Sequence, residues 1–281
     1  MSSGDAHRSS PEWDLSRKVQ LGRTSLQVSR LGLGASYGVS RRACRTAFDA
    51  GVNYFFWGST RTRGMALAIR ELARQHRDEL VVVLQCYVRF PSWVARSIDQ
   101  GLETLGLDYA DVLLLGWHDK LPSARLLDAV EAQRKEGRFR YLAISSHQRS
   151  LFRTLLHQGR YDIFHVRYNA AHPGAEQDVF PELPAGGRPG IVAFTCTRWG
   201  HLLEAKRMPP GEPPLSAGDC YRFVLDNPRV DVAICGPKSD EEMDHALSIL
   251  RKPSLDEAEL ARMRAIGHHV HEQRSLSDWI L

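Results

Sequence analysis

Eight short apolar runs alternate with longer amphipathic segments along most of this chain. The runs are rich in Val, Ile, Leu and aromatic residues, and several are apolar at nearly every position. Such continuous runs are typical of parallel strands that are covered on both faces. The pattern predicts strands over residues 30–34, 52–56, 80–85, 111–116, 141–145, 162–166, 191–195 and 230–235.

The segments between these runs carry apolar residues at helical spacing. Pro91 suits a first helical turn, and Gly51 and Gly106 are typical helix stops. Eight strand–helix repeats in roughly 250 residues favour an α/β fold, a closed (β/α)8 TIM barrel, over an open sheet. No GxGxxG segment follows a predicted strand, which argues against an open dinucleotide-binding sheet. The predicted helices cover residues 40–51, 64–79, 91–106, 123–137, 148–159, 216–227 and 239–252.

The charge and the termini restrict the class of protein. The 281 residues carry a net charge of +4 from scattered Lys and Arg, which does not indicate a nucleic-acid partner. Residues 1–17 are polar and are interpreted as a flexible N-terminal arm before a single barrel domain over residues 18–281. The chain contains neither the apolar stretch of a signal peptide nor the roughly 18 apolar residues of a membrane span. We therefore expect a cytoplasmic protein without a membrane partner.

Cysteine and histidine usage points to no disulfide framework and no metal site. His268, His269 and His271 cluster without paired carboxylates or cysteines, so we expect a helix surface there. Two irregular segments, residues 168–190 and 198–218, are rich in Pro and Gly, and long loops in a barrel usually belong to its functional face. Buried thiols in a reducing compartment are expected for the five cysteines, Cys44, Cys86, Cys196, Cys220 and Cys235.

Several ordered segments resemble the aldo-keto reductases: LGRTSLQVSRLGLG, RSIDQGLETLGLDYADVLLLGWH, EGRFRYLAISS, FHVRYN, IVAFTCTRWGHLL and AICGPKSDEEMDHAL. The resemblance runs from about Val19 to about Leu250. It implies an N-terminal β-hairpin before the barrel and binding of NADP(H) without a Rossmann fold, with NAD(H) not excluded. It also implies a small-molecule carbonyl substrate, because these proteins reduce aldehydes and ketones.

Four residues usually perform the family's chemistry, namely an Asp, a Tyr, a Lys and a His. The Tyr donates a proton to the carbonyl oxygen as hydride arrives, and the Lys, paired with the Asp, lowers the Tyr pKa. The His orients the substrate. At the matching positions this chain has Phe56 for the Asp, Arg61 near the Tyr position, Gln85 for the Lys and Gly116 for the His. An Asp without its Lys would be a poorly compensated charge, so their joint loss is physically coherent.

Residues just beyond these positions are candidates to replace the missing groups. Because strand side chains alternate, Tyr87 should point the same way as Gln85, and His118 the same way as Gly116. Tyr87 and His118 are therefore the predicted catalytic residues, a proton donor and an orienting base. A lipophilic rim tyrosine and a surface histidine are the alternatives. The predicted substrate pocket comprises Phe56, Trp57, Arg61, Gln85 and Trp117.

The resemblance implies a better-retained cofactor site at the ends of the later strands. Ser145 matches the family Ser that holds the nicotinamide amide, and Ser146 stands where an Asn is usual. His165 replaces the Gln of the sixth strand, and Phe194 matches the aromatic residue that stacks on the nicotinamide ring. Each of these has packing at a strand end as its alternative role.

The start of the last barrel helix is the predicted anion site. Lys238 and Ser239 open that helix, and a helix N-terminus with a Lys and a hydroxyl suits an anion. Asp244 lies near the position where the family often has an Arg, which leaves a preference for a 2′-phosphate open. The complete predicted cofactor-binding set is Ser145, Ser146, His165, Phe194, Thr195, Gly236, Lys238 and Ser239.

Three functions are compatible with these residues. The first is an NADP(H)-dependent oxidoreductase of the aldo-keto reductase type with an atypical active site, since hydride transfer depends largely on cofactor positioning. The second is a catalytically inactive barrel that binds a nucleotide or another ligand. The third is a lyase or isomerase that uses Tyr87 and His118 without a cofactor. The sequence indicates neither the substrate nor the oligomeric state.

Overall fold

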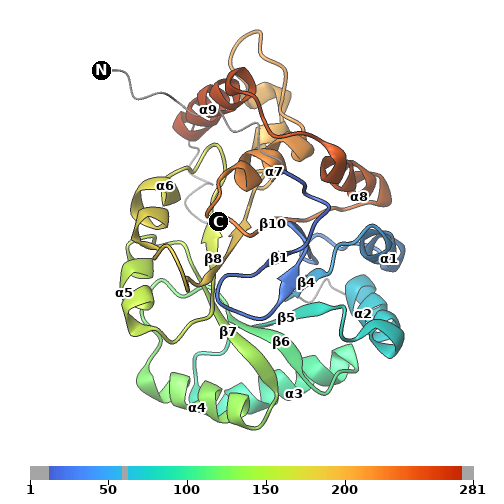
Figure 1. Cartoon of the computed structure of the whole chain (residues 1–281), viewed down its shortest axis with the longest axis vertical. Helices are drawn as coiled ribbons and strands as arrows, with labels where there is room; N and C mark the ends of the chain where they lie inside the picture. The colour runs from blue at the N-terminus through green and yellow to red at the C-terminus, as the bar shows by residue number, and fades with distance from the viewer. Residues whose placement is uncertain (1–12, 59–62, 274–281) are drawn as a thin grey trace.

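The structure, a computed structural model, describes residues 13–58 and 63–273 of the chain. Its strands close into a parallel barrel in the order β10-β3-β4-β5-β6-β7-β8-β9 (Figure 1). The predicted fold class, an α/β (β/α)8 barrel, is therefore confirmed. Each predicted apolar run coincides with one strand to within a few residues: β3 (Leu31–Gly34), β4 (Tyr54–Trp57), β5 (Val81–Cys86), β6 (Ala110–Leu115), β7 (Phe139–Ser146), β8 (Ile163–Arg167), β9 (Gly190–Phe194) and β10 (Val232–Cys235).

Helices surround the barrel on its outside (Figure 1). Serine side chains cap the N-termini of several of these helices by accepting a hydrogen bond from a first-turn N–H group, as Ser123 does for α4. Gly106 ends α3 in the left-handed conformation, as its position in the sequence predicted. The helices at the predicted positions are α1 (Arg41–Asp49), α2 (Arg63–His76), α3 (Val94–Leu105), α4 (Ala124–Lys135), α5 (Leu151–Gln158), α7 (Ala217–Asp226) and α8 (Asp240–Leu247).

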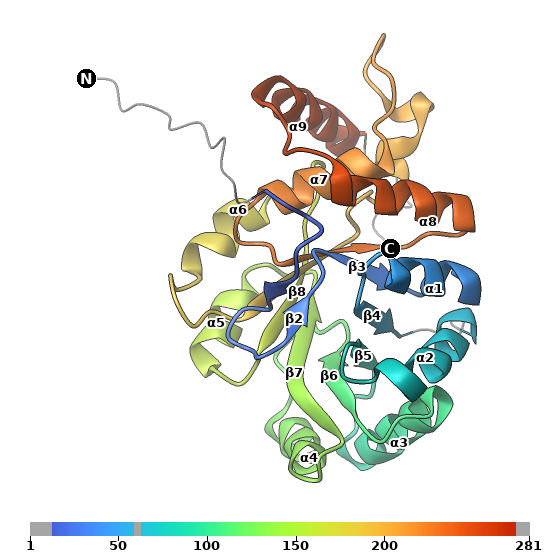
Figure 2. The ribbon, with the colours of Figure 1, turned by 45° about the vertical axis from the view of Figure 1, so that its right-hand side comes forward.

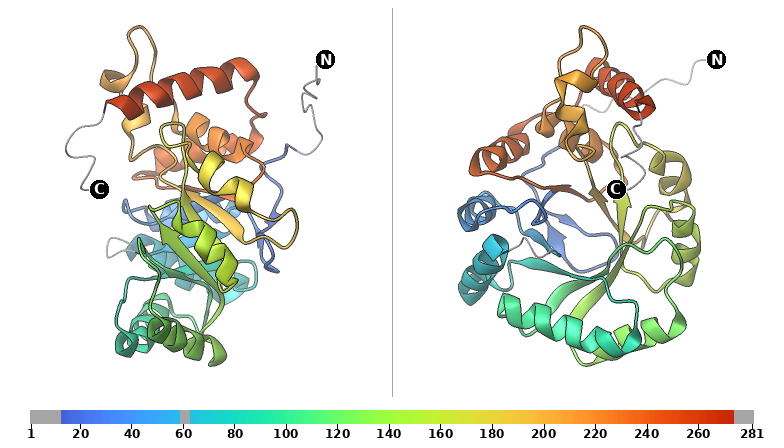
Figure 3. Two further views of the ribbon diagram at one scale, coloured as in Figure 1. Left: turned by 90° about the vertical axis from the view of Figure 1, so that its left-hand side faces the viewer. Right: turned by 180° about the vertical axis from the view of Figure 1, so that it is seen from behind.

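A short and a long helix lie outside the predicted positions. Helix α6 (Ala175–Asp178) lies in the irregular segment after β8, and α9 (Glu257–Glu272) carries the three clustered histidines. The 3-10 turns are η1 (Pro91–Trp93), η2 (Phe180–Glu182), η3 (His201–Leu203), η4 (Ala205–Arg207) and η5 (Ser248–Arg251). The connection between β9 and α7 lies beside α9, where Arg262 contacts Glu212 at 2.8 Å (Figures 2 and 3).

Two hydrophobic clusters account for the apolar strands. One fills the barrel and contains inward-facing residues such as Val83, Val112 and Val192. The other lies between the strands and the surrounding helices and contains alternate strand residues such as Leu113 and Ile144. Since each barrel strand has an apolar neighbour on both sides, nearly every residue along it is buried.

The predicted N-terminal hairpin, β1 (Val19–Gln20) and β2 (Gln27–Val28), is confirmed as an antiparallel pair. Its Leu21, Leu26 and Val28 belong to the hydrophobic cluster inside the barrel. Gly22 has φ of 52°, and a Cβ there would lie 2.2 Å from the backbone nitrogen of Gly190. The hairpin therefore packs against the amino end of β9, which leaves the carboxyl ends of the strands as the place for a site.

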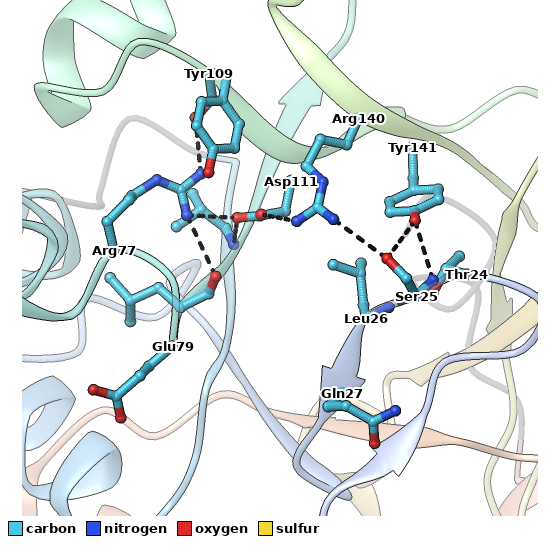
Figure 4. A network of polar contacts seen from close by, with 12 residues as sticks. Thr24, Ser25, Leu26, Gln27, Arg77, Glu79, Tyr109, Asp111, Arg140 and Tyr141 are labelled. Atoms are coloured by element: carbon cyan, nitrogen blue, oxygen red, sulfur yellow. Dashed lines mark hydrogen bonds and ion pairs between the residues drawn. The ribbon is translucent and has the colours of Figure 1, made fainter.

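A polar network joins the amino end of the barrel to the hairpin (Figure 4). The Asp111 carboxylate accepts hydrogen bonds from Arg77 at 2.9 Å and from Arg140 at 3.4 Å. Arg140 also donates to the Ser25 hydroxyl at 3.3 Å, and that hydroxyl lies 2.8 Å from the Tyr141 hydroxyl. Asp111 is only 2% exposed, so its two cationic partners offset the cost of burying its charge.

The part of the predicted N-terminal arm that the structure describes is packed on the barrel. Leu15 is buried at 2% exposure, and the Trp13 indole donates to the carbonyl of Lys252 at 3.1 Å. These two apolar residues anchor an otherwise polar segment. Within residues 13–58 and 63–273, no helix is long and apolar enough to cross a membrane.

Candidate active site

A cavity of about 320 Å³, here called the mouth cavity, opens at the carboxyl ends of the barrel strands. Active sites of such barrels lie at this end. Each strand contributes one residue to its floor, which consists of Gly34, Phe56, Gln85, Leu114, Ser145, His165, Phe194 and Ile234. The loops and helix α7 supply its walls, which include Tyr37, Tyr87, Trp117, His147, Thr195, Trp199, Tyr221 and Gly236.

A second cavity, here called the outer cavity, measures about 480 Å³. It has Lys238, Glu242, His245 and Lys252 in its lining, at the start of α8 and around its end. The residues that line both cavities are Tyr37, Thr197, Trp199, Tyr221 and Gly236. Because they share these walls, the two cavities adjoin each other, and together they are here called the groove, which extends from the barrel floor to α8.

Strained backbone is concentrated at this groove. Trp117, Thr195, Arg198 and Trp199 have φ values of 51° to 56° in the left-handed region. That region is uncommon for residues other than glycine and costs about 1 to 3 kcal/mol per residue. Three of the four, Trp117, Thr195 and Trp199, line the mouth cavity. Such clustering of strain is typical of a ligand site.

Ser145 holds the loop after β6 in place. Its Oγ accepts a hydrogen bond from the backbone N–H of Trp117 at 2.9 Å. Its carbonyl accepts from the backbone N–H of His118 at 2.8 Å. Since the Ser145 hydroxyl acts as the acceptor in its bond with Trp117, its hydrogen is left for a ligand that reaches the cavity floor.

His165 is a neutral imidazole at the floor. Burial lowers its pKa from 6.5 to about 3. Its Nε2 lies 2.9 Å from the hydroxyl of Tyr54, which is buried within the barrel and whose pKa burial raises. The His165 ring also makes an edge contact with Phe56 at 5.7 Å between centroids. His165 therefore offers the cavity a polar edge without a charge.

Tyr87 lies at the rim, 55% exposed, in the lining of the mouth cavity. Partial burial raises the pKa of its hydroxyl, against smaller opposing effects of Gln85 and Arg89, so the group is protonated at neutral pH. Arg89 fixes the rim, because its guanidinium donates to the carbonyls of Tyr87 at 2.9 Å, Gly116 at 2.8 Å and Trp117 at 2.6 Å. Sequence reasoning missed this clamp.

The predicted partner of Tyr87 lies elsewhere. His118 is 5% exposed and is not among the residues that line the mouth cavity. Burial lowers its pKa to about 4, and its Nε2 has no hydrogen-bond partner among the described residues. The left-handed Trp117 ends the strand alternation on which the prediction relied, and Trp117 itself turns to the cavity. The structure thus does not bring Tyr87 and His118 together in this cavity.

Trp57 also faces away from the mouth cavity. It follows the inward-facing Phe56, so alternation directs it outward, toward a separate cavity of about 920 Å³ that Leu67 and Arg70 of α2 help to line. Arg61 lies outside the described residues. Two of the predicted pocket residues are therefore not part of the described mouth cavity, whereas Phe56, Gln85 and Trp117 are.

Two of the predicted cofactor serines have structural bonds. The buried Ser146 hydroxyl accepts from the backbone N–H of Gln148 at 2.9 Å and donates to Asp119 at 3.3 Å. Ser239 caps α8, accepting from the backbone N–H of Glu242 at 3.1 Å. Neither serine is in the lining of the groove. The other predicted cofactor residues, Ser145, His165, Phe194, Thr195, Gly236 and Lys238, do line it.

His147 is a site residue that the sequence did not reveal. Its ring stacks on Phe194 at 5.6 Å and contacts Trp117 at 5.2 Å, across the mouth cavity. Its pKa is lowered, chiefly by burial and further by Arg167. The available signal was its place one residue beyond β7, at the carboxyl edge of the barrel. A planar ligand on Phe194 must use the opposite face or displace His147.

Comparisons with known proteins identify the family of the chain. The sequence pattern of the aldo/keto reductase family matches residues 34–209. The chain belongs to the aldo/keto reductase family. Aldo-keto reductase AKR11C1 from Bacillus halodurans, in its holo form, superimposes with a TM-score of 0.75 at 18% identity, covering 89% of this chain and 96% of that one. The predicted family is thus confirmed.

Two relatives of known activity are similar in sequence. L-Galactose dehydrogenase from Arabidopsis thaliana is 23% identical, over 88% of this chain and 92% of its own length. The NADH-specific methylglyoxal reductase of Escherichia coli (strain K12) is 22% identical, over 59% of this chain and 63% of its own length. Each name states the activity of that relative.

In this aldo/keto reductase, Gln85 is tightly enclosed at the position where the resemblance implies a Lys. A Cβ on Gly116 would lie 2.1 Å from its Nε2, and a Cβ on Gly58 would lie 2.3 Å from its Oε1. Gln85 therefore occupies the space that a side chain at position 116 would need. The Gln at one family position and the Gly at the other are sterically coupled.

The remaining residues give no sign of metal or thiol chemistry. All five cysteines are buried and free, as predicted, and burial raises the pKa of Cys44 and of Cys196 to about 12. Within the described part of the chain, no three His, Cys, Asp or Glu side chains gather in a way that could hold a metal ion.

Proposed function

We propose that this aldo/keto reductase is a nicotinamide-dinucleotide-dependent oxidoreductase that interconverts a carbonyl compound and an alcohol through an atypical active site. The observation that carries the proposal is the pair of adjoining cavities that make up the groove. Its inner part is lined by Ser145, His165 and Phe194, and its outer part by Lys238 and Lys252. The names of the two relatives, a dehydrogenase and a reductase, support the same reaction class.

The lining fits the two ends of such a dinucleotide. At the inner end, the Ser145 hydroxyl and the His165 edge suit a carboxamide, and Phe194 offers an aromatic face. At the outer end, the cations of Lys238 and Lys252 suit phosphate groups. The family resemblance implies NADP(H), with NAD(H) not excluded.

The bound dinucleotide supplies hydride chemistry, and the chain supplies position and protons. Tyr87 holds a proton on its hydroxyl at neutral pH, at the rim of the mouth cavity. It is the proposed donor to the carbonyl oxygen, since Phe56, Gln85 and Gly116 have no acid or base to offer. Neutral His165 donates or accepts one hydrogen bond at the floor, and the rings of Trp117 and His147 lie together in the cavity wall, 5.2 Å apart between centroids.

Binding is the first test. Purified protein is titrated with NADH and with NADPH, following tryptophan quenching and nicotinamide fluorescence. Phe194→Ala should weaken binding roughly tenfold, because stacking on an aromatic side chain contributes about 1 to 3 kcal/mol. Phe90→Ala, which removes a 72% exposed ring outside the groove lining, is the matched control and should bind as wild type does. Absence of binding of both dinucleotides would refute the proposal.

Turnover is the second test. A panel of aldehydes and ketones is offered to wild type and to Tyr87→Phe with a saturating dinucleotide. We expect slow reduction by wild type and a loss of at least roughly tenfold in kcat for the variant. Unchanged activity in Tyr87→Phe would remove Tyr87 from the mechanism. Binding without any turnover would support the inactive barrel instead, and turnover without a dinucleotide would support the lyase or isomerase.

The cytoplasmic location stays a prediction.

A further inference from the structure

We propose that Glu242 makes this protein prefer a dinucleotide with a free adenosine 2′-hydroxyl, NAD(H), over its 2′-phosphorylated form, NADP(H). The inference rests on the proposed function, since it concerns the outer end of the same groove. The Glu242 side chain lines the outer cavity together with Lys238. This is where the sequence predicts an anion site, so a resident carboxylate changes which ligand fits.

Two backbone donors at this position are already occupied by the chain itself. The backbone N–H of Lys238 donates to Oε2 of Glu242 at 2.7 Å. The Ser239 side chain accepts from the backbone N–H of Glu242 at 3.1 Å as the cap of α8. An arriving phosphate would have to displace the Glu242 carboxylate from the Lys238 N–H before it could use that donor.

The negative charge at the start of α8 also opposes the binding of a 2′-phosphate. The first turn of α8 carries Asp240, Glu241 and Glu242. Asp240 is paired with Arg42 at 2.5 Å, whereas no described cation lies within ion-pairing distance of Glu242. A phosphate dianion beside an ionised carboxylate is repelled, whereas a ribose hydroxyl can donate a hydrogen bond to it. Dinucleotide sites of other folds use the same distinction, with an acidic residue on the 2′-hydroxyl and an Arg on the 2′-phosphate.

The cations of the outer cavity do not cancel this effect. The Lys238 ammonium lies 6.0 Å from the centre of the Tyr37 ring, toward the wall shared with the mouth cavity. It and Lys252 are therefore available for the phosphates that both dinucleotides have in common. The position where the resemblance implies an Arg holds Asp244, which adds a further negative charge to α8.

The test compares the dissociation constants of NADH and NADPH in wild type, Glu242→Gln and Glu241→Gln. Gln keeps the shape of the side chain and an oxygen acceptor for the Lys238 N–H, so folding should be retained. Glu241→Gln removes the same charge from the same helical turn, at a residue outside the cavity lining, and is the matched control. Each titration is repeated at low and at high salt.

We expect wild type to bind NADH roughly tenfold more tightly than NADPH, a ratio that falls as salt screens the repulsion. In Glu242→Gln the ratio should narrow by at least roughly threefold through tighter NADPH binding, with Glu241→Gln close to wild type. Equal or tighter binding of NADPH by wild type overturns the inference, and so does an unchanged ratio in Glu242→Gln. Absence of binding of both dinucleotides refutes the proposed function as well, whereas equal binding leaves that function standing.

Discussion

At the residue scale, packing around Gln85 couples two of the family positions, 85 and 116. The side chain fills the space between Gly58 and Gly116, so neither position can hold a Cβ without moving it. The sequence could predict which residues stand at the family positions, because they follow recognisable strands. It could not predict the steric coupling, because Gly58, Gln85 and Gly116 come from three different strand ends.

The coupling predicts a non-additive pair of substitutions. Gly116→His should destabilise the protein by about 1 to 3 kcal/mol, because the imidazole overpacks the site against Gln85. Adding Gln85→Ala removes the clash, so the double variant should be more stable than the sum of the single effects predicts. Urea unfolding of the four proteins measures the coupling. Strictly additive costs would show that Gln85 and position 116 do not compete for space.

Burial of His165 predicts a stability that depends on pH. Its folded pKa of about 3 lies below the unfolded value of about 6.5, so only the unfolded chain gains a proton between these values. Stability should be unaffected above pH 6.5 and should fall as the pH is lowered, by up to about 1.4 kcal/mol per pH unit from this group. His165→Gln, which has no titrating group, should show a shallower fall between pH 7 and pH 5. Identical slopes in the two proteins would contradict the burial argument.

At the element scale, apolar runs and glycine stops predicted the strands and most helices correctly, since a barrel buries its strands on both faces. Alternation failed where a strand ended. Trp117 is left-handed, so the residue after it, His118, turns away from the direction that the alternation predicts. Trp57 shows the opposite case, in which alternation held and directed the ring outward. In the described part of the predicted arm, Trp13 and Leu15 are anchors that the polar composition of residues 1–17 did not reveal.

The Asp111 network joins α2, β6 and the hairpin at the end of the barrel opposite the site. It predicts a loss of stability when Asp111 is replaced. Asp111→Ala should cost about 1 to 3 kcal/mol, because it leaves the buried backbone N–H of Val82 without its acceptor and removes the ion-pair partner of Arg77 and Arg140. Asp99→Ala removes an exposed ion pair with Arg138 and should cost less than about 1 kcal/mol. Denaturant unfolding measures both. Similar costs would mean that the Asp111 network adds no more than a surface pair, and altered dinucleotide affinity in folded Asp111→Ala would mean that the two ends are coupled.

At the scale of the whole molecule, the barrel is what could be predicted and the groove is what could not. Repeated strand–helix units determine a closed barrel and therefore place Ser145, His165 and Phe194 around one opening. The outer cavity depends on the β9–α7 connection and on Tyr37. The conformation of these loops is set by their contacts, and no periodic sequence pattern predicts it. For the same reason the roles of His147, Arg89 and Glu242 emerge only when separate loops are brought together.

The most direct test of the central claim, that this barrel transfers hydride despite its altered floor, is a single-turnover experiment with isotopic label. The protein is saturated with reduced dinucleotide that carries deuterium at the transferable C4 position. It is then mixed with the carbonyl panel, and the masses of the products are measured by mass spectrometry. The account predicts an alcohol product that contains one deuterium. Full recovery of unreduced carbonyl compounds and of labelled dinucleotide, from protein that demonstrably binds it, would contradict the account.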